Sequence, residues 1–224
     1  MSTTDLTIAS ADGTRVSGLW TAPKAAKAGL VLAHGAGAAM THKSMTAIAE
    51  GLAERSVATL RFNFPYMERG SKRPDPPAVA HACVRAAVGE AGRLAPRLSW
   101  FAGGRSFGGR MTSQAQAGAP LPAIRGLVFF AFPLHPAGKP AVDRADHLAK
   151  VDRPMLFLQG SRDDLAQLDL LQGVLSGLGK RATLKVIDEA DHSFHVPAKT
   201  GRKDPEVLSE LLDVARDWML ERAD

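Results

Sequence analysis

Short, continuous runs of apolar residues recur along most of this 224-residue chain. Runs of this kind, without the alternation of a half-exposed strand, are typical of strands that are buried on both faces of a parallel sheet. We predict six such core strands, at 29–33, 57–62, 98–102, 127–132, 155–158 and 183–187. Ahead of them, the segments 6–9 and 16–20 flank Asp12-Gly13, a turn signal that indicates a β-hairpin.

Segments with helical spacing of apolar residues separate these runs. We predict helices at 42–55, 77–94, 107–117, 165–178 and 205–222. The last is expected to start with Asp204 as N-cap and Pro205 at the first helical position. Alternating strands and helices predict an α/β fold: a three-layer sandwich around a mostly parallel, eight-stranded sheet with an N-terminal antiparallel hairpin. Functional side chains are then expected just past the carboxyl ends of the strands.

The segment 133–153 is mostly polar and interrupted by prolines, with room for one short helix at 142–150. It is too short to hold an inserted lid domain. We therefore expect no lid and a shallow, open site.

The composition predicts a single compact domain that spans residues 1–224, because 45% of the residues are hydrophobic and no shift in composition marks a domain boundary. No apolar run approaches the length of a membrane span, and the first ten residues lack the features of a signal peptide. These observations predict a cytoplasmic protein that does not associate with membranes. The sequence indicates no particular oligomeric state.

Charge and cysteine content argue against a nucleic-acid partner and an intramolecular disulfide. The 28 lysines and arginines are interspersed with 23 aspartates and glutamates, so the net charge of +5 does not predict a nucleic-acid partner. Cys83 is the one cysteine, which rules out an intramolecular disulfide, and we interpret it as a small buried apolar residue.

The segment Gly104-Arg105-Ser106-Phe107-Gly108 carries the main chemical signal. It lies where a predicted strand ends and a predicted helix begins. A serine on such a sharp turn is a candidate nucleophile with an exposed hydroxyl, and glycines two residues to either side avoid steric collisions. The pattern needs an acid and a histidine later in the chain, each just after a strand.

Both are present. Asp163 follows the strand predicted at 155–158 and is our candidate for the acid, with Asp164 as the alternative. A second interpretation is that both aspartates only cap a helix starting at Leu165. His192 follows the last predicted strand and is the candidate general base, with His195 as the alternative, because an imidazole titrates near neutral pH. The order Ser, Asp, His is the order found in α/β hydrolases.

The glycine-rich segment His34-Gly35-Ala36-Gly37 follows the strand predicted at 29–33. Its backbone N–H groups face the nucleophile in the predicted fold, so the amides of Ala36 and Phe107 are candidates for an oxyanion hole. A tight structural turn is an alternative. A phosphate-binding loop is disfavoured because no Gly-Lys-Ser/Thr follows. We expect His34 to pack beneath the site.

Candidate substrate contacts are Gly35, Asn63, Tyr66 and Arg105. Asn63 and Tyr66 end a strand, where aromatic residues more often belong to the core or the rim. Arg105 and Arg110 flank the nucleophile and either bind an acidic substrate group or pair with surface carboxylates or water.

A metal site is a weaker interpretation of the histidines near the end of the chain. His192, His195 and Asp191 lie close together in sequence, but no further His or Cys pair at ligand spacing completes a metal site. We therefore predict no metal and no cofactor.

These segments together resemble the α/β-hydrolase superfamily over nearly the whole chain, with the compactness of dienelactone-hydrolase-like enzymes. The closest resemblance is to the α/β-hydrolase-like domain shared by small bacterial proteins, a testis-expressed vertebrate protein and a subunit of a histone acetyltransferase complex. Six segments carry it: HGAGAAMTH, RFNFPYMERG, GGRSFGGRM, FPLHPAGKP, QGSRDDL and ADHSFHVP.

The resemblance implies Ser106 as nucleophile, Asp163 as acid, His192 as base, and the Ala36 and Phe107 amides as oxyanion donors. We expect a cofactor-independent serine hydrolase, similar to carboxylesterases and thioesterases, that acts on a small acyl substrate. The alternative is a catalytically silent interaction module, since the eukaryotic members of the branch are expected to act through protein partners. The fold does not select the substrate.

Overall fold

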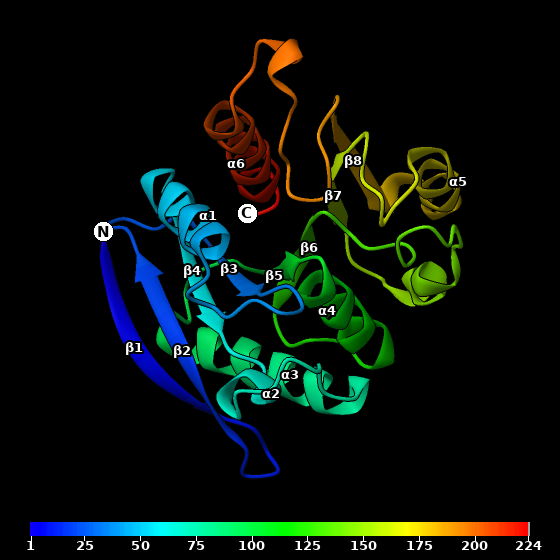
Figure 1. The fold of residues 1–224 in the computed structure, drawn as a ribbon. Helices are drawn as coiled ribbons and strands as arrows, with labels where there is room; N and C mark the ends of the chain where they lie inside the picture. The colour runs from blue at the N-terminus through cyan, green and yellow to red at the C-terminus, as the bar shows by residue number, and fades with distance from the viewer. Residues whose placement is uncertain (224) are drawn as a thin grey trace.

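The computed structural model describes residues 1–223 and contains one open, eight-stranded sheet between two layers of helices (Figure 1). The strand order is β1-β2-β4-β3-β5-β6-β7-β8. The strands are β1 (Ser2–Ala9), β2 (Arg15–Ala22), β3 (Ala28–Ala33), β4 (Val57–Phe62), β5 (Trp100–Arg105), β6 (Ile124–Phe130), β7 (Met155–Gly160) and β8 (Ala182–Ile187).

The direction of the strands is mixed only at the N-terminal edge. β1 and β2 form the predicted antiparallel hairpin, in which Gly13 adopts a φ of 84° that favours glycine, and β2 pairs antiparallel with β4. All pairs from β4 to β8 are parallel. The predicted fold class, a mostly parallel α/β sheet with an antiparallel N-terminal hairpin, is confirmed.

Helices cover both faces of the sheet (Figure 1). The α-helices are α1 (Lys43–Glu54), α2 (Pro65–Glu68), α3 (Pro77–Leu94), α4 (Phe107–Gly118), α5 (Leu168–Leu178) and α6 (Asp204–Leu220). The 3₁₀ helices are η1 (Asp143–Lys150), η2 (Gly179–Arg181) and η3 (Ala198–Thr200). Buried side chains of α3, α4, η1 and α5 form one core with the sheet, and those of α1 and α6 form the other.

The central strands are buried on both faces, as their continuous apolar sequences predict. All six residues of β3 are buried, and its side chains alternate between the two cores: Val31 packs with α3 and α4, whereas Leu30 and Leu32 pack with α1 and α6. Cys83 is fully buried in α3, and burial raises the pKa of its thiol to about 12.

Two predicted helix starts were wrong. α6 begins at Asp204 itself, and the Asp204 carboxylate bonds His195 and the Val196 N–H instead of capping the helix. The helix predicted from Leu165 begins at Leu168. In both cases the residues before the helix make contacts with other segments. Helix propensities do not take such tertiary contacts into account.

Among residues 1–223, no helix combines the length and the apolar character that crossing a membrane requires.

Candidate active site

Ser106 occupies a strained turn between β5 and α4. Its backbone has φ 49° and ψ −117°, a conformation that costs free energy for a residue with a side chain. The turn is held by a hydrogen bond from the Ser106 N–H to the Phe130 carbonyl oxygen at 3.0 Å. Phe107, the first residue of α4, has a backbone N–H with no acceptor within the helix, as at every helix start.

The two glycines of this turn are required by close approach of the backbone. A Cβ at Gly104 would lie 2.3 Å from the Ala33 carbonyl oxygen. One at Gly108 would lie 2.5 Å from the carbonyl oxygens of Ala33 and His34. These distances are too short for any side chain, so α4 can pack this closely against the end of β3 only with glycine at these positions.

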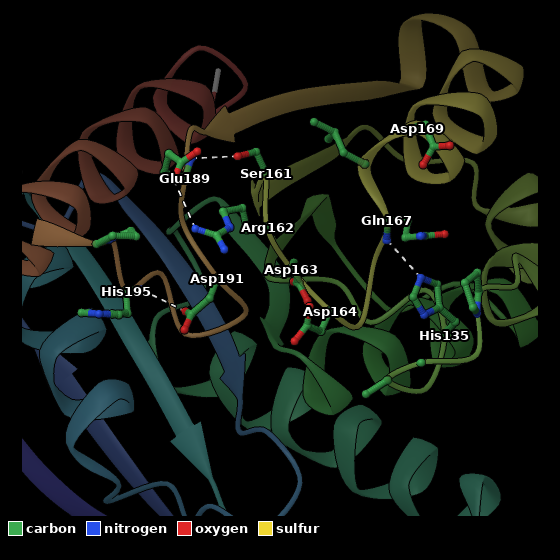
Figure 2. Close-up of a pocket in the computed structure, with 15 residues that line it drawn as sticks. His135, Ser161, Arg162, Asp163, Asp164, Gln167, Asp169, Glu189, Asp191 and His195 are labelled. Carbon is green, nitrogen blue, oxygen red and sulfur yellow. Dashed lines mark hydrogen bonds and ion pairs between the residues drawn. The ribbon is translucent and has the colours of Figure 1, made fainter. Parts of the chain in front are cut away.

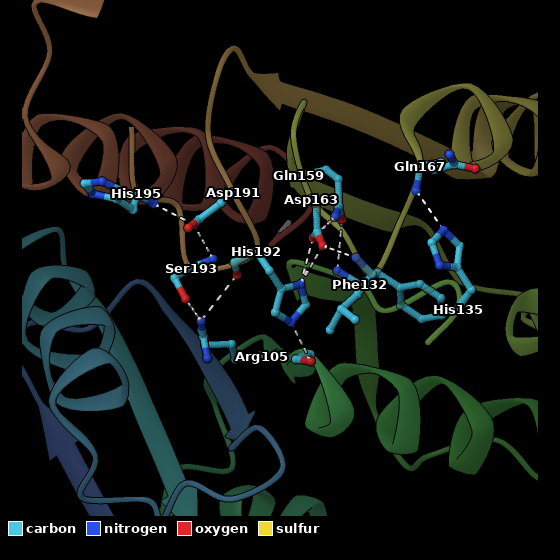
Figure 3. Close-up of polar contacts among 12 residues, drawn as sticks. Arg105, Phe132, His135, Gln159, Asp163, Gln167, Asp191, His192, Ser193 and His195 are labelled. Atoms are coloured by element: carbon cyan, nitrogen blue, oxygen red, sulfur yellow. Dashed lines mark hydrogen bonds and ion pairs between the residues drawn. The ribbon is translucent and has the colours of Figure 1, made fainter. Parts of the chain in front are cut away.

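His192 bridges Ser106 and Asp163 (Figure 3). Its Nε2 lies 2.8 Å from the Ser106 Oγ, and its Nδ1 lies 2.7 Å from one Asp163 carboxylate oxygen and 2.9 Å from the other. A carboxylate only accepts hydrogen bonds, so the Nδ1 carries the proton and the Nε2 is left as an acceptor for the serine hydroxyl. The Asp163 side chain is fully buried, and that of His192 is 21% exposed.

Asp163 is held by donors from its own strand and loop. The Gln159 side-chain amide and the Leu165 backbone N–H, at 2.8 Å, both donate to its carboxylate (Figure 3). The Gln159 amide oxygen accepts the Phe132 N–H at 2.9 Å, which fixes the orientation of the amide. The neighbouring Asp164 is exposed. Gln159 was not among the residues predicted for the site, although a glutamine inside an otherwise apolar strand is a signal of a buried polar contact.

The loop after β3 lies against the nucleophile turn. A Cβ at Gly35 would lie 3.8 Å from the Ser106 Cβ. Fully buried His34 fixes this loop, because its Nδ1 donates to the Gly35 carbonyl at 2.8 Å and its Nε2 accepts the Phe64 N–H at 3.1 Å. Burial lowers the pKa of His34 to about 4, so it is neutral near pH 7. Ala36 is exposed at the tip of the loop.

Asn63 and Tyr66 support the walls of the site. The Asn63 side chain accepts a hydrogen bond from the Met40 N–H at 2.9 Å and donates one to Glu68 at 3.0 Å, so both ends of its amide have partners within the protein. Tyr66 is fully buried, with its ring edge-on to Phe107 at 6.5 Å, and burial raises the pKa of its hydroxyl. Direct substrate contact by either residue remains a prediction.

Arg105 bonds the loop that carries His192 (Figure 3). Its Nη2 donates to the His192 carbonyl oxygen and to the Ser193 Oγ, both at 3.3 Å. Burial lowers the pKa of the guanidinium, and the carboxylates of Asp163 and Asp191 oppose this effect. Within residues 1–223, the Arg105 side chain bonds the His192 and Ser193 oxygens and forms no ion pair with a carboxylate.

An open hollow of about 880 Å³ lies beside the Asp163 loop (Figure 2). Several carboxylates line it, and Ser106 and His192 do not. His195, the alternative base, lies at its edge and pairs with Asp204 at 2.9 Å, away from Ser106. Within residues 1–223, no group of three or more His, Cys, Asp or Glu side chains is arranged to hold a metal ion.

Residues 26–220 match the family described as alpha/beta hydrolase domain, and the chain belongs to that family. Solved structures share its fold. That of dienelactone hydrolase from Anabaena variabilis has a TM-score of 0.80 at 18% identity, with 100% of this chain and 99% of that chain covered. This member of the alpha/beta hydrolase domain family thus has a compact fold similar to that of a dienelactone hydrolase.

Two further structures are similar over comparable lengths. A serine hydrolase without a lid from Xanthomonas campestris has a TM-score of 0.74 at 22% identity, with 97% of this chain and 95% of that chain covered. A cold-adapted esterase from an Arctic intertidal metagenomic library has a TM-score of 0.71 at 18% identity, with 99% and 94% covered. At these identities the likeness establishes the shared fold.

Proposed function

We propose that the protein is a serine hydrolase that cleaves an acyl ester or thioester of a small substrate through an acyl-enzyme. The observation that carries this proposal is the continuous chain of hydrogen bonds from Asp163 through His192 to the strained Ser106. Nucleophile, base and orienting acid are within hydrogen-bond reach of one another, as this mechanism requires. Membership in the alpha/beta hydrolase domain family supports the same reaction class.

In the first half of the reaction, the Ser106 Oγ attacks the carbonyl carbon while His192 Nε2 takes the hydroxyl proton. The buried Asp163 stabilises the imidazolium that forms and keeps the ring in place. The backbone N–H groups of Ala36 and Phe107 stabilise the oxyanion. His192 then gives its proton to the leaving group, the bond to the leaving group breaks, and the acyl group remains on Ser106.

In the second half, water attacks the acyl carbon. His192 takes a proton from the water and returns it to the Ser106 Oγ as the ester bond to the enzyme breaks. The products are the free acid and the regenerated enzyme. No step requires a cofactor, since proton transfer and oxyanion stabilisation come from the side chains and backbone of this chain.

The test is labelling with a fluorophosphonate probe, which reports an activated serine without knowledge of the substrate. Wild type, Ser106→Ala and His192→Ala are compared at equal concentration, with circular dichroism as the control for folding. The proposal predicts labelling of wild type, none of Ser106→Ala, and at least a hundredfold slower labelling of His192→Ala, roughly the loss of a general base. A folded wild type that is not labelled contradicts it.

A further inference from the structure

Among residues 1–223, the half-buried guanidinium of Arg110 has no hydrogen-bond or ion-pair partner, and it contacts the face of the Phe107 ring. It lies on α4, one turn after Ser106. Within residues 1–223 its side chain forms no hydrogen bond and no ion pair, and its Nε is buried with no acceptor. A guanidinium has five N–H donors, and leaving even one of them, here the Nε–H, buried and unsatisfied is unfavourable. The position therefore lacks the acceptor that a guanidinium normally has.

A second arginine, Arg144, lies on η1, the 3₁₀ helix that packs against α4. His147 of η1 contacts Ser113 of α4, with the His147 Nε2 2.7 Å from the Ser113 Oγ, and that hydroxyl donates to the Arg110 carbonyl at 2.9 Å. Arg144 precedes His147 by three residues, and side chains three apart in a 3₁₀ helix lie on one face. Arg144 therefore shares the face of η1 that packs against α4, and its charge adds to burial in lowering the pKa of Arg110.

The nearby histidines add hydrogen-bonding capacity without supplying a counter-charge. Burial, together with the charge of Arg110, lowers the pKa of His147 to about 4, so it is neutral near pH 7. His81 of α3 contacts the Gln114 side chain at 3.3 Å, and burial lowers its pKa as well. The cluster that we call the arginine pair, Arg110 and Arg144, is thus flanked by neutral rings.

No carboxylate of residues 1–223 neutralises the arginine pair. Asp143 and Asp146 lie on the same 3₁₀ helix, but both are exposed and neither forms an ion pair with Arg110 or Arg144. Two uncompensated guanidinium groups close together repel each other, and an anion between them would remove that repulsion and satisfy the free donors.

The arginine pair lies next to the candidate catalytic turn. The Arg110 Cζ is 6.0 Å from the centroid of the Phe107 ring, and Phe107 directly follows Ser106. Arg110 lies four residues after Ser106, which is about 6 Å along the helix axis, a distance that a short acyl chain can span. We propose that Arg110 and Arg144 bind an anionic group of the substrate, a carboxylate or phosphate, and so select acidic esters. This inference rests on the hydrolase function proposed above.

The first test compares matched esters. Mono-4-nitrophenyl glutarate carries a carboxylate at the end of its acyl chain, and 4-nitrophenyl pentanoate has a neutral chain of similar length. We expect wild type to hydrolyse the glutarate with a kcat/KM about tenfold higher or more, the fold-change that one charged hydrogen bond gives. Arg110→Gln and Arg144→Gln should each lose the preference for the glutarate over the pentanoate, through a higher KM for the glutarate.

Arg125→Gln is the matched control, because it removes the same charge from an exposed position on β6. It should retain the preference. Equal kcat/KM for the two esters in wild type, or a preference that survives in both Arg110→Gln and Arg144→Gln, would overturn the proposal. Arg144→Gln keeps the test decisive if the Arg110→Gln variant fails to fold.

The second test does not depend on turnover. Glutarate and inorganic phosphate are titrated separately into wild type and Arg144→Gln by isothermal titration calorimetry. We expect at least one of the two anions to bind wild type, at least tenfold more tightly than Arg144→Gln, and the tighter one identifies carboxylate or phosphate as the preferred group. If neither binds, the anion site is wrong even if esters are hydrolysed. If an anion binds but no ester is hydrolysed, the function is wrong and the site stands.

Discussion

The guanidinium of Arg105 donates a hydrogen bond to the backbone carbonyl oxygen of His192 at 3.3 Å. The residue just before the candidate nucleophile thus holds the loop that carries the candidate base. Ser106 and His192 come from distant parts of the chain, and the Arg105 side chain ties their two loops together directly (Figure 3). Arg105 is a positioning residue in this arrangement, since its donors are used by the His192 loop.

We predict that Arg105→Ala lowers kcat for 4-nitrophenyl esters by about a hundredfold with little change in KM. The reason is that a shift of His192 by about 1 Å is enough for a loss of this size. Steady-state kinetics check the result, and added guanidinium ion should restore part of kcat by filling the vacated position.

Arg162→Ala serves as the control for Arg105. Its guanidinium is exposed and pairs with Glu189 at 3.2 Å, so it also joins two loops but does not contact His192. Its kcat should stay within about twofold of wild type, because exposed ion pairs contribute little. An equal loss of kcat in Arg105→Ala and Arg162→Ala would show that Arg105 has only a general role in stability.

Replacing Gln159 should weaken both stability and activity. In Gln159→Leu, the Phe132 N–H and the Asp163 carboxylate each lose a buried partner, so we expect the free energy of unfolding to fall by about 1–3 kcal/mol. Urea denaturation measures this change. Gln167→Ala, at an exposed side chain, should change stability by less than about 0.5 kcal/mol. A Gln159→Leu protein as stable as wild type would contradict the prediction.

His34 gives the protein a defined dependence of stability on pH. Its folded-state pKa of about 4 lies below the ordinary value of 6.5, because burial disfavours the charged ring. Between these pH values the unfolded chain binds more protons, so this contribution is present above pH 6.5 and is lost as the pH falls toward 4. The stability difference between wild type and His34→Gln should therefore narrow by roughly 3 kcal/mol over this range. A constant difference in urea denaturation at pH 7, 6, 5 and 4 would argue against a buried neutral His34.

Gly108→Ala should disrupt the nucleophile turn. The added Cβ would lie 2.5 Å from two backbone carbonyl oxygens, so we expect a loss of at least about 2 kcal/mol of stability together with loss of activity. Gly118→Ala at the other end of α4 meets nothing within 4 Å and should change stability by less than about 1 kcal/mol. Thermal denaturation of both variants checks the contrast, and similar melting temperatures would refute it.

The sequence predicted the parts of the fold that depend on local pattern. Continuous apolar runs predicted the six core strands within a few residues, because strands buried on both faces need apolar side chains at every position. The Asp12-Gly13 turn signal predicted the hairpin of β1 and β2. The helix predicted at 77–94 has those bounds in α3. The short α2, Pro65–Glu68, was not predicted, since four residues leave no periodic pattern to detect.

The sequence predicted those residues of the candidate site whose role is indicated by their own loop. Ser106, Asp163 and His192 were found because each follows a strand in the expected order, and the structure brings them within hydrogen-bond distance. The contacts of Gln159 and Arg105 were not predicted, because they join segments far apart in the chain. Such contacts depend on tertiary packing, which sequence pattern does not encode.

Mapping the fluorophosphonate adduct by tandem mass spectrometry tests the proposed mechanism most directly. Wild type is labelled to completion and digested, and the modified residue is identified. The mechanism predicts one adduct, on the Oγ of Ser106. An adduct on another residue, or a folded wild type with no adduct, would contradict it.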